Sequence, residues 1–414
     1  MPEFIPLSFA GYDWRRPELQ PDLVTAPPYD VLSPEQRDEL AAKSPYNLVH
    51  VDMPRSYAQA GEILTQWVSQ GVIRKKDEPE FAALASRYVL QGREYVRWGF
   101  MGGLRLASWG KEGVYPHEQT YPKAKTDRLE LMRATNAQLS PIFGIFDHQD
   151  SQLQTICDLL NDQPPTATMV TEDEVEHRLW SVPREYNEVI RQALENTPVY
   201  IADGHHRYET ALHFAQHHAG PALEPGTMGH RPADYVFACL CNIATPGVEI
   251  LPYHRMVRGS RNHSWPDVLQ QAETWFHIRQ AGTSNDLEQS ILPSASLLTL
   301  PDKMWLLELK PEFIAQCDPL FQDVGAYVLD TFLFRKSLGL TEEDLSGGGH
   351  LAYTPFIDHA VASVVYGESQ AALLLKAVDM NVLRRVSESG RVMPRKSTFF
   401  YPKLPGGLLF HLLG

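Results

Sequence analysis

Apolar and polar positions along the chain follow patterns that predict both helices and strands. Apolar residues recur at helical spacing between Tyr57 and Gln70, with Ser56 as an N-cap and Gly71 as a stop. Between Ala83 and Leu106, aromatic and β-branched residues broken by a Gly-Arg-Glu turn predict an antiparallel pair of strands. These segments predict an α/β or α+β protein with a mixed sheet.

One further predicted segment matters most for the chemistry. Val199 to Ala202 is a short apolar run that ends at Asp203-Gly204, and apolar residues then recur from Tyr208 at positions i, i+3, i+4 and i+7. This order predicts a strand, a tight turn and a helix. The other predictions are helices that start at Ser33-Pro34-Glu35 and span about Thr126 to Gln138, central strands at Tyr235 to Cys241 and Val248 to Leu251, and a hairpin from Leu297 to Leu309 that turns at Pro301-Asp302.

The length of 414 residues, 43% of them hydrophobic, is enough for two or three domains. We expect a catalytic region with phosphate-binding motifs at 1–255, an α/β insert or second subdomain at 256–345, and a C-terminal segment at 346–414 that packs back on the core. The run Gly347-Gly348-Gly349 predicts a surface loop near the last boundary. The four cysteines are few and widely spaced, and we expect reduced core thiols at Cys157, Cys239, Cys241 and Cys317.

The charge balance is acidic, with 37 Lys and Arg against 51 Asp and Glu and a formal charge of −14. This leaves no global positive field for a polyanion, so nucleic acid is not an expected partner. No charged leader followed by an apolar run opens the sequence, and nowhere do 18 apolar residues follow one another. We therefore expect a cytoplasmic protein that is neither secreted nor membrane-spanning, and the sequence leaves its oligomeric state open.

The most informative string is Asp-Gly-His-His-Arg at the predicted junction of strand and helix. The strand delivers Asp203 to its C-terminal end, Gly204 permits the sharp turn, and the helix opens with His205, His206 and Arg207. The N–H groups and positive dipole of a helix start favour an anion, and an arginine there can bind phosphate oxygens bidentately. Asp203 would then hold Mg²⁺ or accept a hydroxyl proton. The alternative is that Asp203 caps the helix and both histidines are surface residues.

A second string, from His117 to Arg128, collects a carboxylate, an imidazole, two lysines and an arginine, and the prolines beside it predict a stiffened loop. It lacks the two histidines one helical turn apart that a zincin requires. Glu118 is its candidate general base or metal ligand, and Lys123, Lys125 and Arg128 are candidates to neutralise phosphate charge. The alternative is a solvated charged loop.

A third string, from Met393 to Lys403, offers an ammonium and two hydroxyls at Lys396-Ser397-Thr398, without the glycines of a P-loop. Lys396 is a candidate phosphate ligand, and the alternative is a basic edge strand. Three weaker pointers are more readily interpreted as structural loops or buried polar groups: Ala26 to Ser33, Asn47 with His50, and Pro252 to Arg255.

Several strings of the sequence occur together in one known family. In chain order they are Ala26-Pro-Pro-Tyr-Asp-Val-Leu-Ser33, His117-Glu-Gln-Thr120 followed by Asp127-Arg-Leu129, Leu139-Ser-Pro-Ile-Phe-Gly144, Ile201-Ala-Asp-Gly-His-His-Arg207, Leu251-Pro-Tyr-His-Arg255 and Met393-Pro-Arg-Lys-Ser-Thr398. Over nearly its whole length the chain resembles the prokaryotic family catalogued as domain of unknown function 1015.

A narrower resemblance concerns the nine residues that begin at Asp203. They are similar to the second motif of the ParB and sulfiredoxin superfamily, and closest to its variant in ParB-like free-serine kinases, which phosphorylate L-serine from a nucleotide. In that superfamily the motif lies at a helix N-terminus and binds phosphates. The resemblance implies catalytic or metal-associated roles for Asp203 and for His205 or His206, with Arg207 on phosphate. By position Glu118 resembles the kinases' general base, although the His-Glu-Gln-Thr around it departs from theirs.

These strings predict a small-molecule phosphotransferase that moves a phosphoryl group from ATP, ADP or pyrophosphate to a hydroxyl acceptor, with Mg²⁺ as the bridging cation. The resemblance to the free-serine kinases implies L-serine as a candidate acceptor. The alternatives are a metal-dependent phosphohydrolase and a nucleotide-binding regulatory module, like the ParB CTP switch, without small-molecule turnover. In each case the two strings must form one site, so we expect the Glu118 and His205 side chains to lie within about 12 Å of each other.

Overall fold

The computed structural model describes residues 1–219, 231–259, 264–346 and 349–414, and the chain forms two compact units. Unit 1 comprises Met1–Val248 and Pro402–Gly414, and unit 2 comprises Glu249–Tyr401. These boundaries differ from the three parts expected from the sequence, because the chain returns to unit 1 after residue 401. The functional division into three parts stays a prediction, and the expected boundary residues Gly347 and Gly348 lie outside the described residues.

Unit 1 is built on a nine-stranded mixed sheet, in the order β6-β11-β8-β12-β5-β4-β10-β9 with β1 paired to β5. The pairs β11–β6 and β12–β8 are parallel and the other pairs are antiparallel. The strands are β1 (Phe4–Ile5), β4 (Ala82–Leu90), β5 (Arg93–Arg105), β6 (Val114–Tyr115), β8 (Ile142–Phe146), β9 (Ala167–Val170), β10 (Glu176–Ser181), β11 (Val199–Asp203) and β12 (Tyr235–Asn242). The expected mixed sheet is confirmed.

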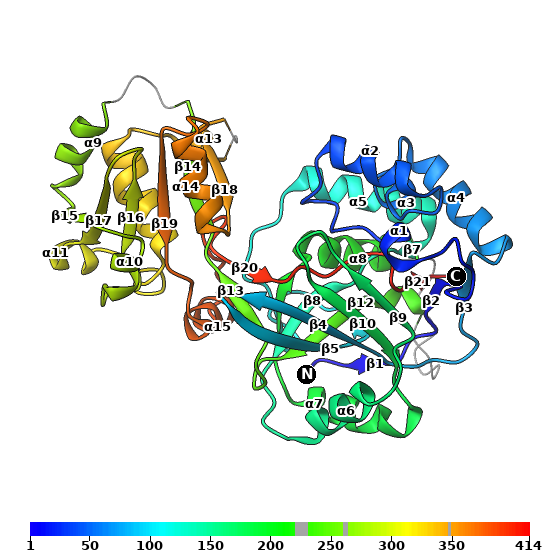
Figure 1. Ribbon diagram of the computed structural model, residues 1–414. Helices are drawn as coiled ribbons and strands as arrows, with labels where there is room; N and C mark the ends of the chain where they lie inside the picture. The colour runs from blue at the N-terminus through cyan, green and yellow to red at the C-terminus, as the bar shows by residue number, and fades with distance from the viewer. Residues whose placement is uncertain (220–230, 260–263, 347–348) are drawn as a thin grey trace. The chain divides into compact units, whose positions relative to one another are not determined.

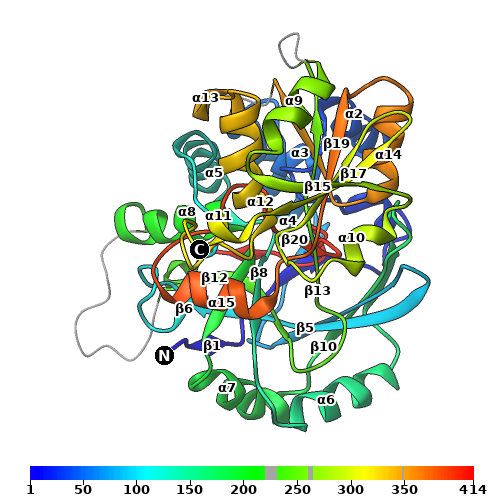
Figure 2. The same ribbon diagram turned by 90° about the vertical axis from the view of Figure 1, so that its left-hand side faces the viewer.

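Helices cover both faces of this sheet. Helices α6 and α7 lie along one side, and α2 to α5 lie on the other (Figure 1; Figure 2). The helices of unit 1 are α1 (Pro21–Val24), α2 (Pro34–Lys43), α3 (Val49–Asp52), α4 (Tyr57–Ser69), α5 (Pro122–Thr135), α6 (Gln152–Asn161), α7 (Asn187–Glu195) and α8 (His205–His217), with short 3-10 turns η1 (Arg184–Tyr186) and η2 (Pro232–Asp234). Within this unit α5 packs against both α4 and α8.

The segment after residue 401 completes unit 1. Phe410 is fully buried and exchanges two backbone hydrogen bonds with Ala10, of 2.7 and 2.9 Å. Strand β21 (His411–Leu412) pairs with β7 (Ala137–Gln138), and β2 (Ala10–Tyr12) pairs with β3 (Ile73–Lys75). The core of the unit therefore includes residues from both ends of the described chain.

Unit 2 has an antiparallel six-stranded sheet with helices on both faces. Its order is β15-β17-β16-β19-β14-β18, and β13 (Glu249–Leu251) pairs separately with β20 (Phe399–Tyr401). The strands are β14 (His254–Val257), β15 (Phe276–Ala281), β16 (Ser296–Thr299), β17 (Met304–Leu309), β18 (Leu351–Thr354) and β19 (Ala371–Leu375). The helices are α9 (Trp265–Ala272), α10 (Asn285–Gln289), α11 (Pro311–Ile314), α12 (Gly325–Val328), the π-helix η3 (Leu329–Ser337), α13 (Glu342–Ser346), α14 (Ile357–Val365) and α15 (Met380–Glu388).

Most of the locally encoded elements are confirmed. Ser56 caps α4 by accepting a hydrogen bond from the Gln59 N–H, and Ser33 forms a capping box with Gln36 at the start of α2. The hairpins β4–β5 and β16–β17 pair as expected, and all four cysteines are free and buried. Within the described parts of the chain, no helix is both long and apolar enough to cross a membrane.

Two expectations about elements were wrong. The string from His117 to Arg128 is not a loop throughout, because α5 begins at Pro122, a residue that favours the first helical position. Strand β13 is not a central strand. It pairs with β20 alone, because three half-buried residues give it no face to bury in a larger sheet.

Candidate functional site

The strand–turn–helix that carries Asp203 forms as the sequence predicts. Strand β11 ends at Asp203, Gly204 adopts φ +90°, and the 13-residue helix α8 starts at His205. A Cβ at position 204 would lie 3.0 Å from Cγ2 of Ile142 and 3.1 Å from two nitrogens of the Arg207 guanidinium. Glycine is therefore required both for the backbone conformation and for the close approach of Arg207.

Asp203 is paired with a lysine that the sequence analysis did not select. Nζ of Lys403 lies 3.0 Å from Oδ2 of Asp203, and Oδ1 accepts a 2.7 Å hydrogen bond from the Gly204 N–H. Burial raises the pKa of Asp203, but the charges of Lys403 and Arg207 outweigh burial and hold that pKa well below its usual range. Asp203 is thus ionised at neutral pH, and its low pKa makes it a poor general base.

The two histidines of the motif hold the loop at residues 117–121 against the start of α8. The His117 N–H donates to Nε2 of His205 at 3.2 Å, and the Tyr121 N–H donates to Nε2 of His206 at 2.9 Å. Burial lowers the pKa of both His205 and His206, so both rings are neutral and carry their proton on Nδ1. Their catalytic roles stay predictions, and these contacts give them a structural task.

Glu118 faces this histidine pair. Its Oε2 lies 3.9 Å from Nδ1 of His205, although the two residues are far apart in sequence. The expected proximity of the two strings is therefore confirmed. The Glu118 side chain is about one-third exposed, so it is open to a ligand.

Lys125, another cation of the second string, is already paired. Nζ of Lys125 lies 2.9 Å from Oε2 of Glu209, which also accepts from Thr120, while its Oε1 accepts from Nε1 of Trp109. Lys123 lies in α5, but its side chain is outside the described part of the structure. These contacts do not require a phosphate, and the predicted phosphate roles stay untested.

Arg128 is buried between two carboxylates. It donates to Oδ1 of Asp52 at 2.9 Å and to Oδ2 of Asp127 at 2.8 Å, and its guanidinium carbon lies 3.9 Å from the centroid of the Tyr29 ring. Both acids compensate its charge. This favours a structural role for Arg128 over the phosphate role expected from the sequence.

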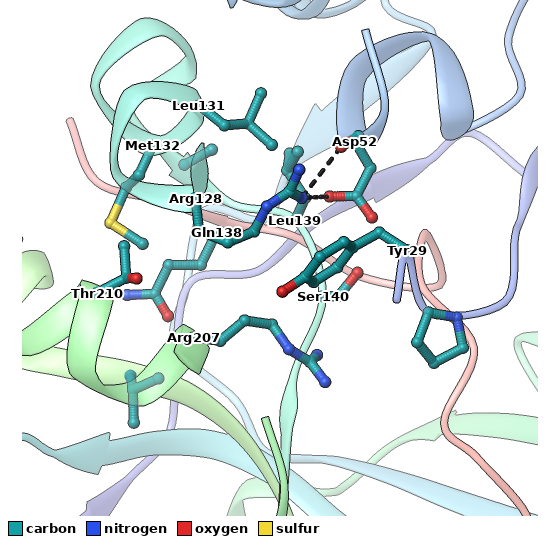
Figure 3. Close-up of a pocket in the computed structure, with 13 residues that line it drawn as sticks. Tyr29, Asp52, Arg128, Leu131, Met132, Gln138, Leu139, Ser140, Arg207 and Thr210 are labelled. Atoms are coloured by element: carbon teal, nitrogen blue, oxygen red, sulfur yellow. Dashed lines mark hydrogen bonds and ion pairs between the residues drawn. The ribbon is translucent and has the colours of Figure 1, made fainter. Parts of the chain in front are cut away.

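Arg207 lines a small pocket (Figure 3), and its charge also lowers the pKa of Asp203. It donates one hydrogen bond to the Pro141 carbonyl. The pocket has a volume of about 50 Å³, which has room for a few water molecules. Ser140 Oγ and Thr210 Oγ1 belong to its wall and have no hydrogen-bond partner among the described residues, so water or a ligand group must satisfy them.

A second carboxylate beside Asp203 comes from a segment that was only a weak pointer in the sequence. The Val31 N–H donates to the Pro28 carbonyl at 3.1 Å and closes a turn with Tyr29 and Asp30 at its centre. Desolvation by surrounding atoms, and then the charge of Asp203, raise the pKa of Asp30. The charges of Arg207 and Lys403 act in the opposite direction and lower it. Because Asp30 is itself exposed, solvent weakens these effects.

The structure separates the two lysines of the C-terminal string. Lys403 belongs to unit 1 and contacts Asp203, whereas Lys396 belongs to unit 2, where its Nζ lies 4.8 Å from the centroid of the Tyr253 ring. No local signal distinguishes the two lysines in the sequence. The selection of Lys396 as phosphate ligand remains a prediction.

Asp203 and Glu118, the expected metal ligands, are poorly arranged to bind a metal ion. Asp203 already binds an ammonium and a backbone N–H, so a metal ion would have to displace Lys403. Across the described ranges, no three His, Cys, Asp or Glu side chains gather in a way that could hold a metal ion.

Comparison with solved structures finds distant resemblances. A conserved hypothetical protein from Pyrococcus furiosus is 15% identical, with 71% of this chain and 90% of that chain covered and a TM-score of 0.36. A free serine kinase in complex with AMP is 14% identical over 72% and 89% with a TM-score of 0.38, and C-terminally truncated SbnI from Staphylococcus aureus is 9% identical over 73% and 84% with a TM-score of 0.37. These scores are too low to argue a shared activity.

The sequence comparisons are more decisive about family. No curated protein matches the chain. Residues 7–331 match the family described as protein of unknown function DUF1015. This match covers well over half of the sequence and includes all of the strings identified above except Met393 to Thr398. The chain belongs to the DUF1015 family.

Proposed function

We propose that unit 1 binds the phosphates of a nucleotide or another phosphoanhydride at the start of α8 and transfers a phosphoryl group to a small hydroxyl compound. The observation that carries this proposal is the ionised Asp203 carboxylate, held beside Lys403 and Arg207 at the N-terminus of a helix. An exposed ion pair of one acid and one base would not need a second cation and a helix N-terminus. A phosphate, in contrast, needs several positive groups that converge from different elements.

Three kinds of positive group would bind the phosphates. The first turn of α8 presents backbone N–H groups and the positive end of the helix dipole. The Arg207 guanidinium has five N–H donors and uses one of them on the Pro141 carbonyl, so it retains donors for phosphate oxygens. Lys403 adds positive charge beside Asp203.

Asp30 and Glu118 are the two candidate general bases. The raised pKa of Asp30 makes its carboxylate a better proton acceptor than Asp203, and Glu118 is the accessible carboxylate next to His205. In the proposed step the acceptor oxygen forms a bond to the terminal phosphorus while the bond from phosphorus to the bridging oxygen breaks. The leaving phosphate keeps the electron pair, and the carboxylate takes the hydroxyl proton.

The acceptor is proposed to be a small hydroxyl compound, with L-serine as the first candidate. This part rests on the resemblance of the Asp203 string to ParB-like free-serine kinases, and not on a contact in the pocket. ATP, ADP and pyrophosphate are the proposed donors.

Calorimetric titration with ATP, ADP and pyrophosphate, each with and without Mg²⁺, tests the phosphate site. We expect Arg207→Ala to weaken binding by about 30-fold or more, because it removes a charge-assisted contact. Arg191→Ala is the matched control, since Arg191 is an exposed arginine of α7 paired with Glu188. Equal affinities in wild type and Arg207→Ala would contradict the proposal.

Phosphorus NMR of mixtures with L-serine tests the transfer itself. A phosphoserine signal that appears as the donor is consumed supports phosphotransfer. Release of inorganic phosphate without a phosphorylated acceptor would identify a hydrolase instead, and tight binding without turnover would identify a nucleotide-binding regulatory module.

A further inference from the structure

Arg97, in the middle of β5, is a buried cation of unit 1 that the chemistry above does not use. Its side chain is 1% exposed, and no Asp or Glu of the described chain lies within ion-pair distance of it. Removing a charge from water without a counter-ion is costly. A residue that served packing alone could be neutral, so this charge calls for an explanation.

The contacts of Arg97 lead to both halves of the Asp203–Lys403 pair. Its Nη1 donates to the carbonyl of Pro402, the residue next to Lys403 in the chain. Its guanidinium carbon lies 4.7 Å from the centroid of the Phe143 ring, and Phe143 stands opposite Asp203 in the pairing of β8 with β11. The Arg97 side chain therefore contacts a backbone neighbour of the lysine and the strand partner of the aspartate.

Two further side chains, Ser86 and His177, hold the Arg97 guanidinium in place through hydrogen bonds. Nη2 of Arg97 donates to Oγ of Ser86 at 3.4 Å, and that oxygen lies 2.9 Å from Nδ1 of His177. Burial, and then the Arg97 charge, lower the pKa of His177 to about 3, so its ring is neutral. Nδ1 can then accept the Ser86 proton, which leaves the Ser86 oxygen lone pairs to Arg97.

We infer that Arg97 is a positioning residue for the phosphate site: by binding the Pro402 carbonyl and stacking on Phe143, it fixes Lys403 against Asp203. This inference rests on the proposed function. Arg97 itself touches no reacting group. Its effect on a nucleotide must therefore pass through Lys403.

A double-mutant cycle on ADP binding tests this dependence. The variants are Arg97→Gln, Lys403→Ala and the two combined, with ADP affinity measured by calorimetric titration of the full-length protein. We expect each single variant to bind ADP at least tenfold more weakly than wild type. We expect the combined variant to bind no more than about twofold more weakly than Lys403→Ala. If Arg97 acts only through Lys403, the effects of the two substitutions on binding are not additive.

A merely structural Arg97 gives a different pattern. In that case Arg97→Gln lowers the melting temperature but keeps the ADP affinity of wild type, or the two losses multiply in the combined variant. Either result would overturn the inference. Arg105→Gln is the matched control, since Arg105 lies on the same strand and pairs with Glu3 at a half-exposed position, and it should leave ADP affinity unchanged.

The failure of the proposed function is separable from the failure of this inference. If Lys403→Ala binds ADP as wild type does, Lys403 takes no part in binding and the inference is overturned, whereas the phosphate site itself is refuted only if Arg207→Ala also keeps the wild-type affinity. If Arg97→Gln does not fold, Arg97→Lys takes its place, because it retains the buried charge and one donor. We expect its ADP affinity to fall between wild type and Lys403→Ala, with no further loss in combination with Lys403→Ala, and multiplied losses would contradict the inference.

Discussion

Two neighbouring aspartates of unit 1 are driven in opposite directions by their surroundings. Asp203 has Lys403 and Arg207 beside it, and their charges outweigh burial and lower its pKa. Desolvation, and then the charge of the Asp203 carboxylate, raise the pKa of Asp30, although solvent weakens both effects because Asp30 is exposed. Such a split between adjacent acids is typical of sites where one carboxylate anchors charge and the other moves a proton.

Replacing Asp30 by Asn separates catalysis from stability. We expect Asp30→Asn to lower the rate of phosphoryl transfer by about 100-fold or more, because it removes the candidate general base with the raised pKa. ADP affinity and melting temperature should be unchanged or raised, since the substitution removes repulsion from Asp203. Turnover at the wild-type rate would exclude Asp30 as the base. Glu118→Gln, measured in parallel, would then be expected to lower the rate of phosphoryl transfer instead.

The two aspartates also predict two separate responses to acid. Asp203 has a pKa lowered by folding, so its pair with Lys403 stabilises the fold fully above the unfolded aspartate pKa of about 3.9 and loses that effect as the pH falls through the lower folded pKa. Asp30 has a raised pKa, so transfer activity should fall at a pH above about 3.9.

Rate profiles and urea unfolding between pH 3 and pH 8 would check this order. Activity should disappear while the protein is still folded. Asp203→Asn should lose the acid dependence of stability that the pair contributes. Loss of activity and fold at the same pH would contradict the assignment.

At the scale of elements, the strand–turn–helix at residues 199–217 was predictable because every signal in it is local. The apolar run, the glycine and the helical spacing of apolar residues all lie within about twenty residues. The pairing of Asp203 with Lys403 was not predictable in this way. Lys396 and Lys403 lie in the same basic string, and only the return of the chain to unit 1 decides which of them meets the aspartate.

Gly204→Ala tests the turn as an element. An alanine at position 204 must adopt φ +90°, and its Cβ would lie close to both Ile142 and Arg207. We therefore expect a loss of about 1–3 kcal/mol in the free energy of unfolding, together with weaker ADP binding. Gly92→Ala, in the β4–β5 turn, is the matched control. Its φ is +75°, and nothing lies within 4 Å of the added Cβ, so it measures the backbone cost alone. Equal effects of the two substitutions on ADP binding would refute a specific role for the turn.

At the scale of the whole molecule, unit 2 is inserted between two parts of unit 1. Its first and last strands, β13 and β20, pair with each other, and Glu249 stands opposite Tyr401. The two points where the chain crosses between units are therefore adjacent in space. The sequence could not predict this connection, because β13 and β20 are three-residue strands about 150 residues apart.

Removing Glu249–Tyr401 tests whether the site belongs to unit 1 alone. Because paired antiparallel residues lie about 5 Å apart, a linker of about four residues can join Val248 to Pro402. We expect this shortened protein to unfold cooperatively on heating and to bind ADP with the affinity of the full chain. A folded product without ADP binding would show that unit 2, and with it Lys396, takes part in the site.

The insertion also sets the order in which the site is assembled during synthesis. The ribosome makes the strand and helix that carry Asp203 and Arg207 first, then about 150 residues of unit 2, and only afterwards Lys403. Because 200 residues separate Asp203 from Lys403, this delay lasts roughly 10 to 40 seconds at about 5–20 residues per second. Throughout that time the Asp203 carboxylate is without its lysine and the core is without Phe410. If the proposed function holds, a nascent chain therefore cannot complete its phosphate site until all of unit 2 has been synthesised.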